Sequence, residues 1–252
     1  MSRRRTPRVP LVGAVILAAV IVVVLVQQEG GAGSPAPSSS SVAQPGVTET
    51  MVPDATVPAT VPDATTPGSA AASAAQLATL AVKGRAPMTG YDRVGDFGTA
   101  WTDVDHNGCD TRDDILARDL TSVTKSGVCT VLTGVLVSPY TGATIPFTRG
   151  VATSTAVQID HLVALGDAWQ TGAQQIAQEQ RVALANDPLN LLAVDGRSNE
   201  QKSDGDAATW LPANKAIRCE YVERQVAVKA KYALWVTPAE HDAIGGILAG
   251  CP

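Results

Sequence analysis

Five polar residues in the second half of the chain have the types and spacing that phosphodiester hydrolysis requires. Asp160 and His161 end a β-like run, and Asn190 opens a second one. Asn199 and Lys202 lie near the start of a predicted helix. Neutral imidazole can take a proton from water near neutral pH, and carboxylate and amide oxygens suit Mg²⁺. A helix N-terminus also favours a phosphate, so this set indicates metal-assisted hydrolysis.

Short-range patterns predict the elements that must position these side chains. Apolar and polar residues alternate over 157–162, which predicts a strand or its end, and 189–194 predicts a second short strand. Ser198 is expected to cap the following helix, with Gln201 completing a capping box. Because adjacent strand residues point to opposite faces, the Asp-His pair shares one metal face only if the strand ends or bends there.

The rest of the second half alternates between helical and extended patterns, with Gly- and Asp-rich loop over 84–110. Helices are predicted at 76–82, 112–120, 167–184, 217–235 and from Thr237 to Gly250, and strands at 129–137 and 143–147. The expected class is therefore α+β, with a small β-hairpin-plus-helix unit among helices.

Residues 157–204 resemble the HNH nuclease motif, also called the His-Me finger or ββα-metal motif. The resemblance rests on Asp160-His161, on Asn190 within Pro-Leu-Asn-Leu-Leu, and on Asn199-x-x-Lys202. The wider span from Asp110 to Cys251 is similar to exported bacterial HNH-family proteins related to the C-terminal nuclease domain of GmrSD-type restriction enzymes. The resemblance implies a ββα-metal core over about 156–206, embedded among helices.

The resemblance also implies a role for each motif residue. His161 would be the general base, and Asp160 and Asn199 would bind a divalent metal, Mg²⁺ or else Mn²⁺. Asn190 would brace the finger and help to orient His161, and Lys202 would contact a phosphate. The metal would stabilise the departing 3′ oxygen, leaving a 5′-phosphate and a 3′-hydroxyl. Many HNH fingers add a Cys-x-x-Cys zinc staple, which this sequence lacks.

The expected partner is a nucleic acid, with DNA favoured over RNA, and the protein is expected to be a monomer. Arg149 is a further candidate for a substrate phosphate, although a surface arginine explains it equally well. Four of the 19 Lys and Arg and four of the 24 Asp and Glu precede residue 76, leaving 15 basic and 20 acidic residues. This acidic balance argues against tight non-specific binding to nucleic acid, but not against one local metal-neutralised site.

The first 75 residues differ from the rest. Four arginines precede an apolar run over 11–26, so residues 1–30 are expected to be an export signal or a membrane anchor, and both remain open. Residues 31–75 are rich in Pro, Ser, Thr and Ala, which predicts a disordered linker. Residues 76–252 would form the nuclease domain, secreted or tethered to the outer face of the membrane.

Four cysteines in an exported domain predict two disulfides. Of the three possible connectivities, Cys109–Cys129 with Cys219–Cys251 is favoured because each bond closes a local loop.

Two alternatives stay open. The chain could be a non-catalytic cell-surface binding module that keeps a vestigial finger, consistent with its long linker and acidic charge. Separately, the run from Asp103 to Asp114 fits either an EF-hand-like Ca²⁺ loop or an ordinary Asx-rich loop.

Overall fold

The structure is a computed structural model that describes residues 69–252. Its helices are α1 (Ala70–Leu77), α2 (Arg93–Phe97), α3 (Thr111–Asp119), α4 (Leu165–Gln170), α5 (Gln178–Asn186), α6 (Gly196–Lys202), α7 (Arg218–Lys231) and α8 (Pro238–Leu248). Its strands are β1 (Thr121–Ser126), β2 (Thr130–Val137), β3 (Thr144–Thr148), β4 (Val157–His161) and β5 (Leu191–Asp195). The 3-10 helices are η1 (Ser154–Ala156), η2 (Ala173–Gln175) and η3 (Lys215–Ile217).

The predicted export segment and most of the predicted linker lie outside the described residues. The linker prediction ends too late, because α1 begins at Ala70 and buries Ala70 and Leu77 against α7 and α8. Among residues 69–252, no helix has both the length and the apolar character that crossing a membrane requires.

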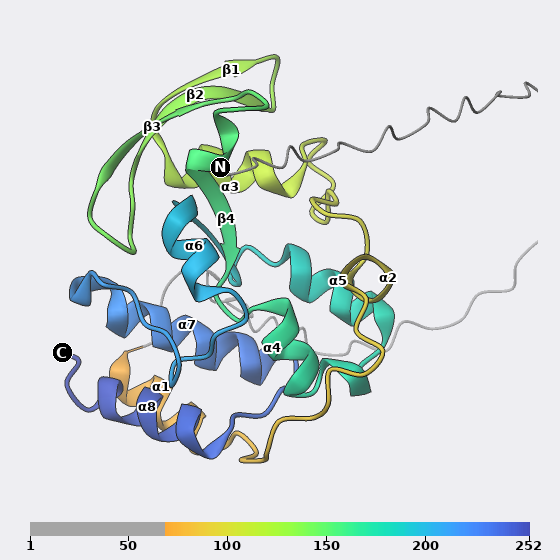
Figure 1. Cartoon of the computed structure of the whole chain (residues 1–252), viewed down its shortest axis with the longest axis vertical. Coiled ribbons are helices and arrows are strands. Elements are labelled where there is room, and N and C mark those ends of the chain that lie inside the picture. The colour runs from red at the N-terminus through yellow and green to blue at the C-terminus, as the bar shows by residue number, and fades with distance from the viewer. Residues whose placement is uncertain (1–68) are drawn as a thin grey trace, which may run out of the picture. The chain divides into compact units, whose positions relative to one another are not determined.

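The predicted α+β class is confirmed, with two antiparallel sheets among helices (Figure 1). One sheet has the order β1-β2-β3, and the other pairs β4 with β5 from Val157↔Asp195 to His161↔Leu191. The helix α6 follows β5 directly, which gives the expected β-β-α order. Strand β1 was not predicted, since its sequence Thr-Ser-Val-Thr-Lys-Ser is largely exposed and lacks apolar alternation.

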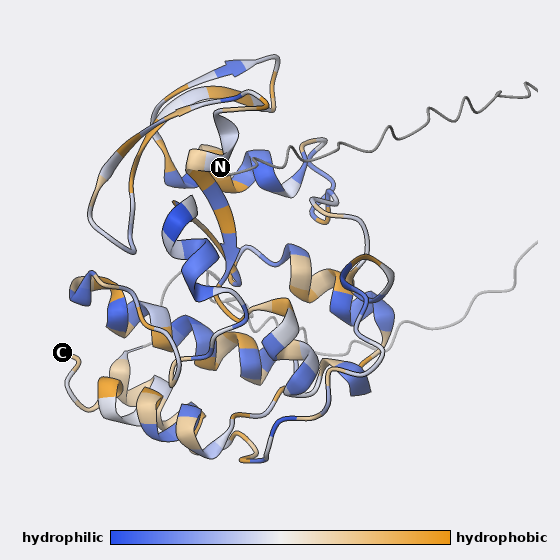
Figure 2. Cartoon of the chain, viewed as in Figure 1, coloured by the Kyte–Doolittle hydropathy of each residue, from blue (hydrophilic) through white to orange (hydrophobic). Residues whose placement is uncertain are grey.

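A shared core fixes the β4–β5 pair against α3 and the larger sheet. Val157 and Ile159 of β4 and Leu191 of β5 pack with Leu116 of α3 and Phe147 of β3. Figure 2 shows that hydrophobic and hydrophilic residues alternate along β4, whereas polar residues run along α6. Burial of this apolar surface, at roughly 25 cal/mol per Å², holds the strand that carries Asp160 and His161.

Two predictions about helices near the β-β-α unit are wrong. The helix predicted over 167–184 is divided into α4, η2 and α5, and the first break is at Gly172, whose φ is 132° and which packs against Leu234 and Trp235. A β-carbon would crowd that contact, so packing against another segment decides the break. The cap of α6 is Asp195, whose side chain accepts a hydrogen bond from the Ser198 N–H.

The long helix α7 packs against α1 and α8, and it buries a charged group as well as apolar ones. Lys229 is fully buried, and its ammonium lies 3.0 Å from Asp167 and 2.7 Å from Glu240. Asp206 lies close to both carboxylates and pairs with Arg85 at 2.7 Å. The Lys229 ammonium already occupies the position between these carboxylates, so the cluster is a structural ion network. The predicted capping box of Thr237 and Glu240 starts α8.

Both favoured disulfides are confirmed. Cys109–Cys129 ties the loop before α3 to the turn between β1 and β2, and Cys219–Cys251 ties the start of α7 to the C-terminus.

Candidate active site

The end of β4 and the helix α6 bring three of the predicted site residues to one cavity. Asp160, His161 and Asn199 all line a cavity of about 240 Å³. Strand β4 ends at His161, so the alternation of side chains ends there and neighbouring residues can reach the same space. Arg93 of α2, together with Ser203 and Asp204 just after α6, completes the polar lining.

His161 is held in the form that a general base requires. Its Nε2 lies 2.9 Å from the Ala185 carbonyl oxygen, which can only accept, so Nε2 carries the proton and Nδ1 keeps its lone pair. Burial and then the positive charge of Arg93 lower the pKa of His161 to about 3. The imidazole is therefore neutral at physiological pH and able to accept a proton.

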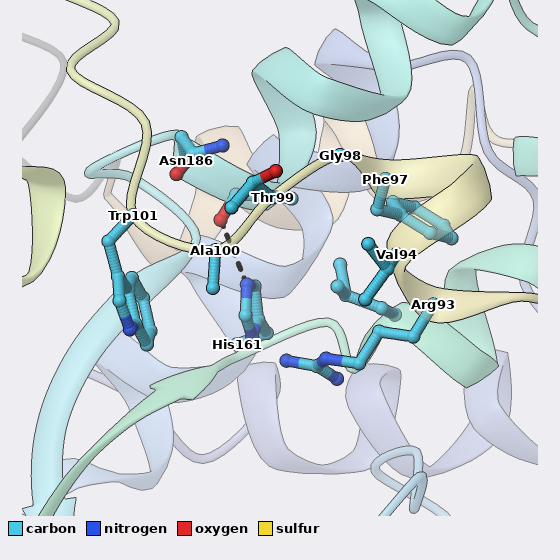
Figure 3. A pocket seen from close by; sticks show the side chains of 11 residues that line it. Arg93, Val94, Phe97, Gly98, Thr99, Ala100, Trp101, His161 and Asn186 are labelled. Atoms are coloured by element: carbon cyan, nitrogen blue, oxygen red, sulfur yellow. Dashed lines mark hydrogen bonds between the residues drawn. The ribbon is translucent and has the colours of Figure 1, made fainter. Parts of the chain in front are cut away.

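A second, smaller cavity of about 50 Å³ opens beside His161 (Figure 3). Trp101 lies on one side with its ring stacked nearly parallel to the imidazole, at 6.2 Å between centroids and 12° between planes. Arg93 lies on the other side and extends its guanidinium toward His161. With these neighbours His161 is only 7% exposed, so access to its imidazole is restricted.

Asp160 is anchored on both carboxylate oxygens. One accepts a hydrogen bond from the Tyr140 hydroxyl, and the other lies 3.0 Å from the Lys202 ammonium. Lys202 also donates to the His161 carbonyl oxygen at 2.8 Å and is fully buried. The Lys202 ammonium, which was expected to contact a phosphate, therefore binds Asp160 and the His161 carbonyl oxygen inside the protein.

The donor set fits a divalent cation such as Mg²⁺. Asn199 donates its amide N–H to Gln158 at 2.8 Å, which directs its Oδ1 away from that bond. Asp160 retains lone pairs beyond its two hydrogen bonds, and Asp204 offers an exposed carboxylate at the same cavity. Oxygen donors around a space that also admits water are what Mg²⁺ prefers.

Asn190 is fully buried and fastens two backbone segments near His161. Its Oδ1 accepts from the Val163 N–H at 2.8 Å, and its Nδ2 donates to the Val163 and Leu184 carbonyl oxygens. Val163 follows β4, and Leu184 precedes the residue whose carbonyl binds His161. These contacts are consistent with the bracing role that the motif implies.

Arg149 lies in a different place. It pairs with Asp113 and donates to the Val131 carbonyl oxygen at 2.6 Å, so it joins β2 and the end of β3 to α3. It lines neither of the two cavities beside His161.

The loop before α3 is organised by its own hydrogen bonds. Asp103 accepts from the Gly108 N–H at 3.0 Å, and Asp105 and Asp114 both accept from the Asn107 amide. This arrangement is that of an Asx-rich loop stapled by Cys109–Cys129.

Sequence patterns missed four residues of the site. Arg93 and Trp101 lie in a stretch predicted only as loop, Tyr140 lies between two predicted strands, and Asp204 is the last residue of the predicted motif span. Nothing in their spacing relates them to His161, since they come from separate elements. Tyr140 and Asp204 lie within the span from Asp110 to Cys251 that resembles exported HNH-family proteins, but the resemblance assigned no role to either residue.

Comparison with known families agrees with this geometry. The family model of the C-terminal domain of GmrSD restriction endonucleases matches residues 110–247. The chain belongs to this family. The predicted relation to HNH nucleases is confirmed, and the match spans the β-β-α unit together with α3 and most of α8.

An uncharacterized secreted protein of Arthroderma benhamiae is 37% identical over 185 residues, covering 73% of this chain and 86% of that protein. No solved structure matches the chain.

Proposed function

We propose that this chain is an exported, metal-dependent HNH endonuclease that hydrolyses phosphodiester bonds of DNA, with RNA as the second choice of substrate. The observation that carries the proposal is the convergence of neutral His161 with the oxygens of Asp160 and Asn199 at one cavity. Membership of a nuclease family adds to it.

Each residue of the site has a separate role in the proposed hydrolysis. His161 accepts a proton at Nδ1 from the attacking water, while the Ala185 carbonyl keeps the ring in the required tautomer. Asn190 holds the backbone on both sides of that contact. Asp160 and Asn199, with Mg²⁺ favoured over Mn²⁺, would hold the metal. When bound, a divalent metal supplies positive charge that stabilises the leaving 3′ oxygen.

Location outside the cytoplasm is part of the proposal. Two disulfides require an oxidising compartment to form and persist. The matched relative is called secreted, and the arginine-flanked apolar run of residues 11–26 suits export. Secretion and tethering to the membrane predict different products, and N-terminal sequencing of the exported protein separates them.

The function is tested with the purified chain, supercoiled plasmid, and either Mg²⁺ or a chelator. Nicking that requires the metal and disappears in His161→Ala supports the proposal. Absence of metal-dependent nicking, or full activity in His161→Ala, would refute the proposal. A Lys125→Gln variant serves as the control, because Lys125 is exposed on β1 and lines neither cavity beside His161.

A second candidate function is a surface binding module without turnover. The enclosure of His161 beneath Trp101 favours it, because a base that is 7% exposed must be uncovered before water and phosphate reach it. Specific binding to a polymer without any cleavage by the metal-loaded chain would support this alternative.

A further inference from the structure

The cation that contacts substrate phosphate must be found among residues other than Lys202. A phosphate contact needs donors that can reach the cavity, whereas the Lys202 ammonium is fully buried between Asp160 and the His161 carbonyl oxygen. Withdrawing it would leave a buried carboxylate without its counter-charge. A side-chain contact to the phosphate must therefore come from another positive group at the mouth of the cavity.

Arg93 has the properties that this role requires. Its side chain lines both cavities that flank His161, and it is exposed. The arginines that form ion pairs within residues 69–252 do not include it; they are Arg85, Arg118, Arg149, Arg181 and Arg224. An arginine fork with no carboxylate partner can bind a phosphate in a bidentate manner.

The segment that carries Arg93 is fixed by packing rather than left free. Phe97 of α2 is 1% exposed and meets the Trp169 ring edge-on at 6.4 Å. From α5, Arg181 donates to the Asp96 carbonyl oxygen at 3.0 Å and Gln178 donates to the Gly95 carbonyl oxygen at 2.7 Å. A donor held in place before substrate arrives loses little entropy on binding.

The position of Arg93 is also hard to explain as a structural feature. Figure 3 shows its guanidinium directed to the imidazole of His161 across the cavity, and both side chains line that cavity. A guanidinium that forms no ion pair gains a counter-charge when an anion binds between it and the imidazole. A phosphodiester supplies that anion.

We propose that Arg93, which precedes the family match at residues 110–247, binds the scissile phosphate of the nucleic acid beside His161. This assignment rests on the proposed nuclease function. Arg93 thereby places the phosphate against Nδ1 of His161 and balances the negative charge of the phosphate. Trp101, on the opposite side of the imidazole, forms the facing wall of the same site.

The test compares Arg93→Gln, Arg93→Lys and Lys125→Gln in the full chain with plasmid and Mg²⁺. Lys125, exposed on β1, provides the same change of charge away from both cavities. Arg93→Gln should lower kcat/KM by about 100-fold, the usual effect of removing one donor to the transition state. Arg93→Lys should retain part of the activity, and Lys125→Gln should match the wild type. Wild-type kinetics in Arg93→Gln would overturn the assignment and leave the nuclease proposal intact.

A binding measurement keeps the two proposals separate. Fluorescence anisotropy of a labelled DNA duplex is followed with His161→Ala and with His161→Ala/Arg93→Gln, neither of which should cut the probe. Arg93→Gln should weaken binding about 10-fold, the effect of one charge-assisted hydrogen bond. If the wild type never cuts DNA, this Arg93-dependent binding still supports the assignment. Equal binding by the two proteins, or no binding by either, would overturn it in that case.

Discussion

Replacing Lys202 with methionine should destabilise the whole domain rather than only weaken substrate binding. The Lys202 ammonium and the Asp160 carboxylate lie 3.0 Å apart, with side chains 0% and 5% exposed. Methionine fills much of the space of the lysine stem but leaves the carboxylate with Tyr140 as its remaining donor. Removing one partner of a buried pair costs about 3–5 kcal/mol in the free energy of unfolding. That is a large part of the stability of a typical domain.

The assay is urea unfolding followed by tryptophan fluorescence, with Lys125→Met as the control on the exposed face of β1. The control should stay within about 0.5 kcal/mol of the wild type. The double variant Lys202→Met/Asp160→Asn should recover part of the loss, because a neutral amide can still accept from Tyr140 and needs no cation. A Lys202→Met variant as stable as the wild type, with a raised KM, would refute the structural assignment and restore Lys202 as a phosphate contact.

Three further outcomes follow from packing, covalent links and charge. Gly196→Ala should lower the free energy of unfolding by about 1–3 kcal/mol, because the added β-carbon would overlap a backbone carbonyl oxygen. Gly246→Ala in α8 has open space around the added β-carbon and should raise the free energy of unfolding by about 0.5–1 kcal/mol. A higher urea midpoint for Gly196→Ala than for Gly246→Ala would contradict both expectations. Replacing Cys219 and Cys251 by serine opens a link of sequence separation 32 and should cost about 3–4 kcal/mol, measured by thermal unfolding against the disulfide-bonded wild type. Burial raises the pKa of Glu240 from 4.5 to about 7, so the folded state binds more protons than the unfolded state between those values, and stability should fall as pH rises from about 4.5 to 7. This fall should be smaller in Glu240→Gln, and identical pH profiles of the two proteins would reject the explanation.

The sequence predicted the elements of the active site well because their signals are local. Strand alternation in 157–162, the β-run before α6 and the capping box at Thr237 each depend on residues a few positions apart. Cysteine spacing likewise favoured the two disulfides that the structure contains, since short loops close at low entropic cost.

Predictions that failed depended on contacts between distant segments. The break at Gly172 results from its packing against Leu234 and Trp235, which lie far from it in the sequence, after α7. The cap of α6 moved to Asp195 because that residue ends β5 and reaches the Ser198 N–H. Periodicity carries no information about either contact.

The sequence by itself determined that Asp160, His161, Asn190 and Asn199 belong to one β-β-α unit, since a hydrolytic site needs those groups and short-range patterns place them. Only the tertiary structure decided which charges are free. It buries Lys202 against Asp160 and brings Arg93 to the mouth of the cavity. The physical reason is that residue type fixes which groups a chain carries, whereas burial and long-range packing fix which of them remain exposed to a substrate.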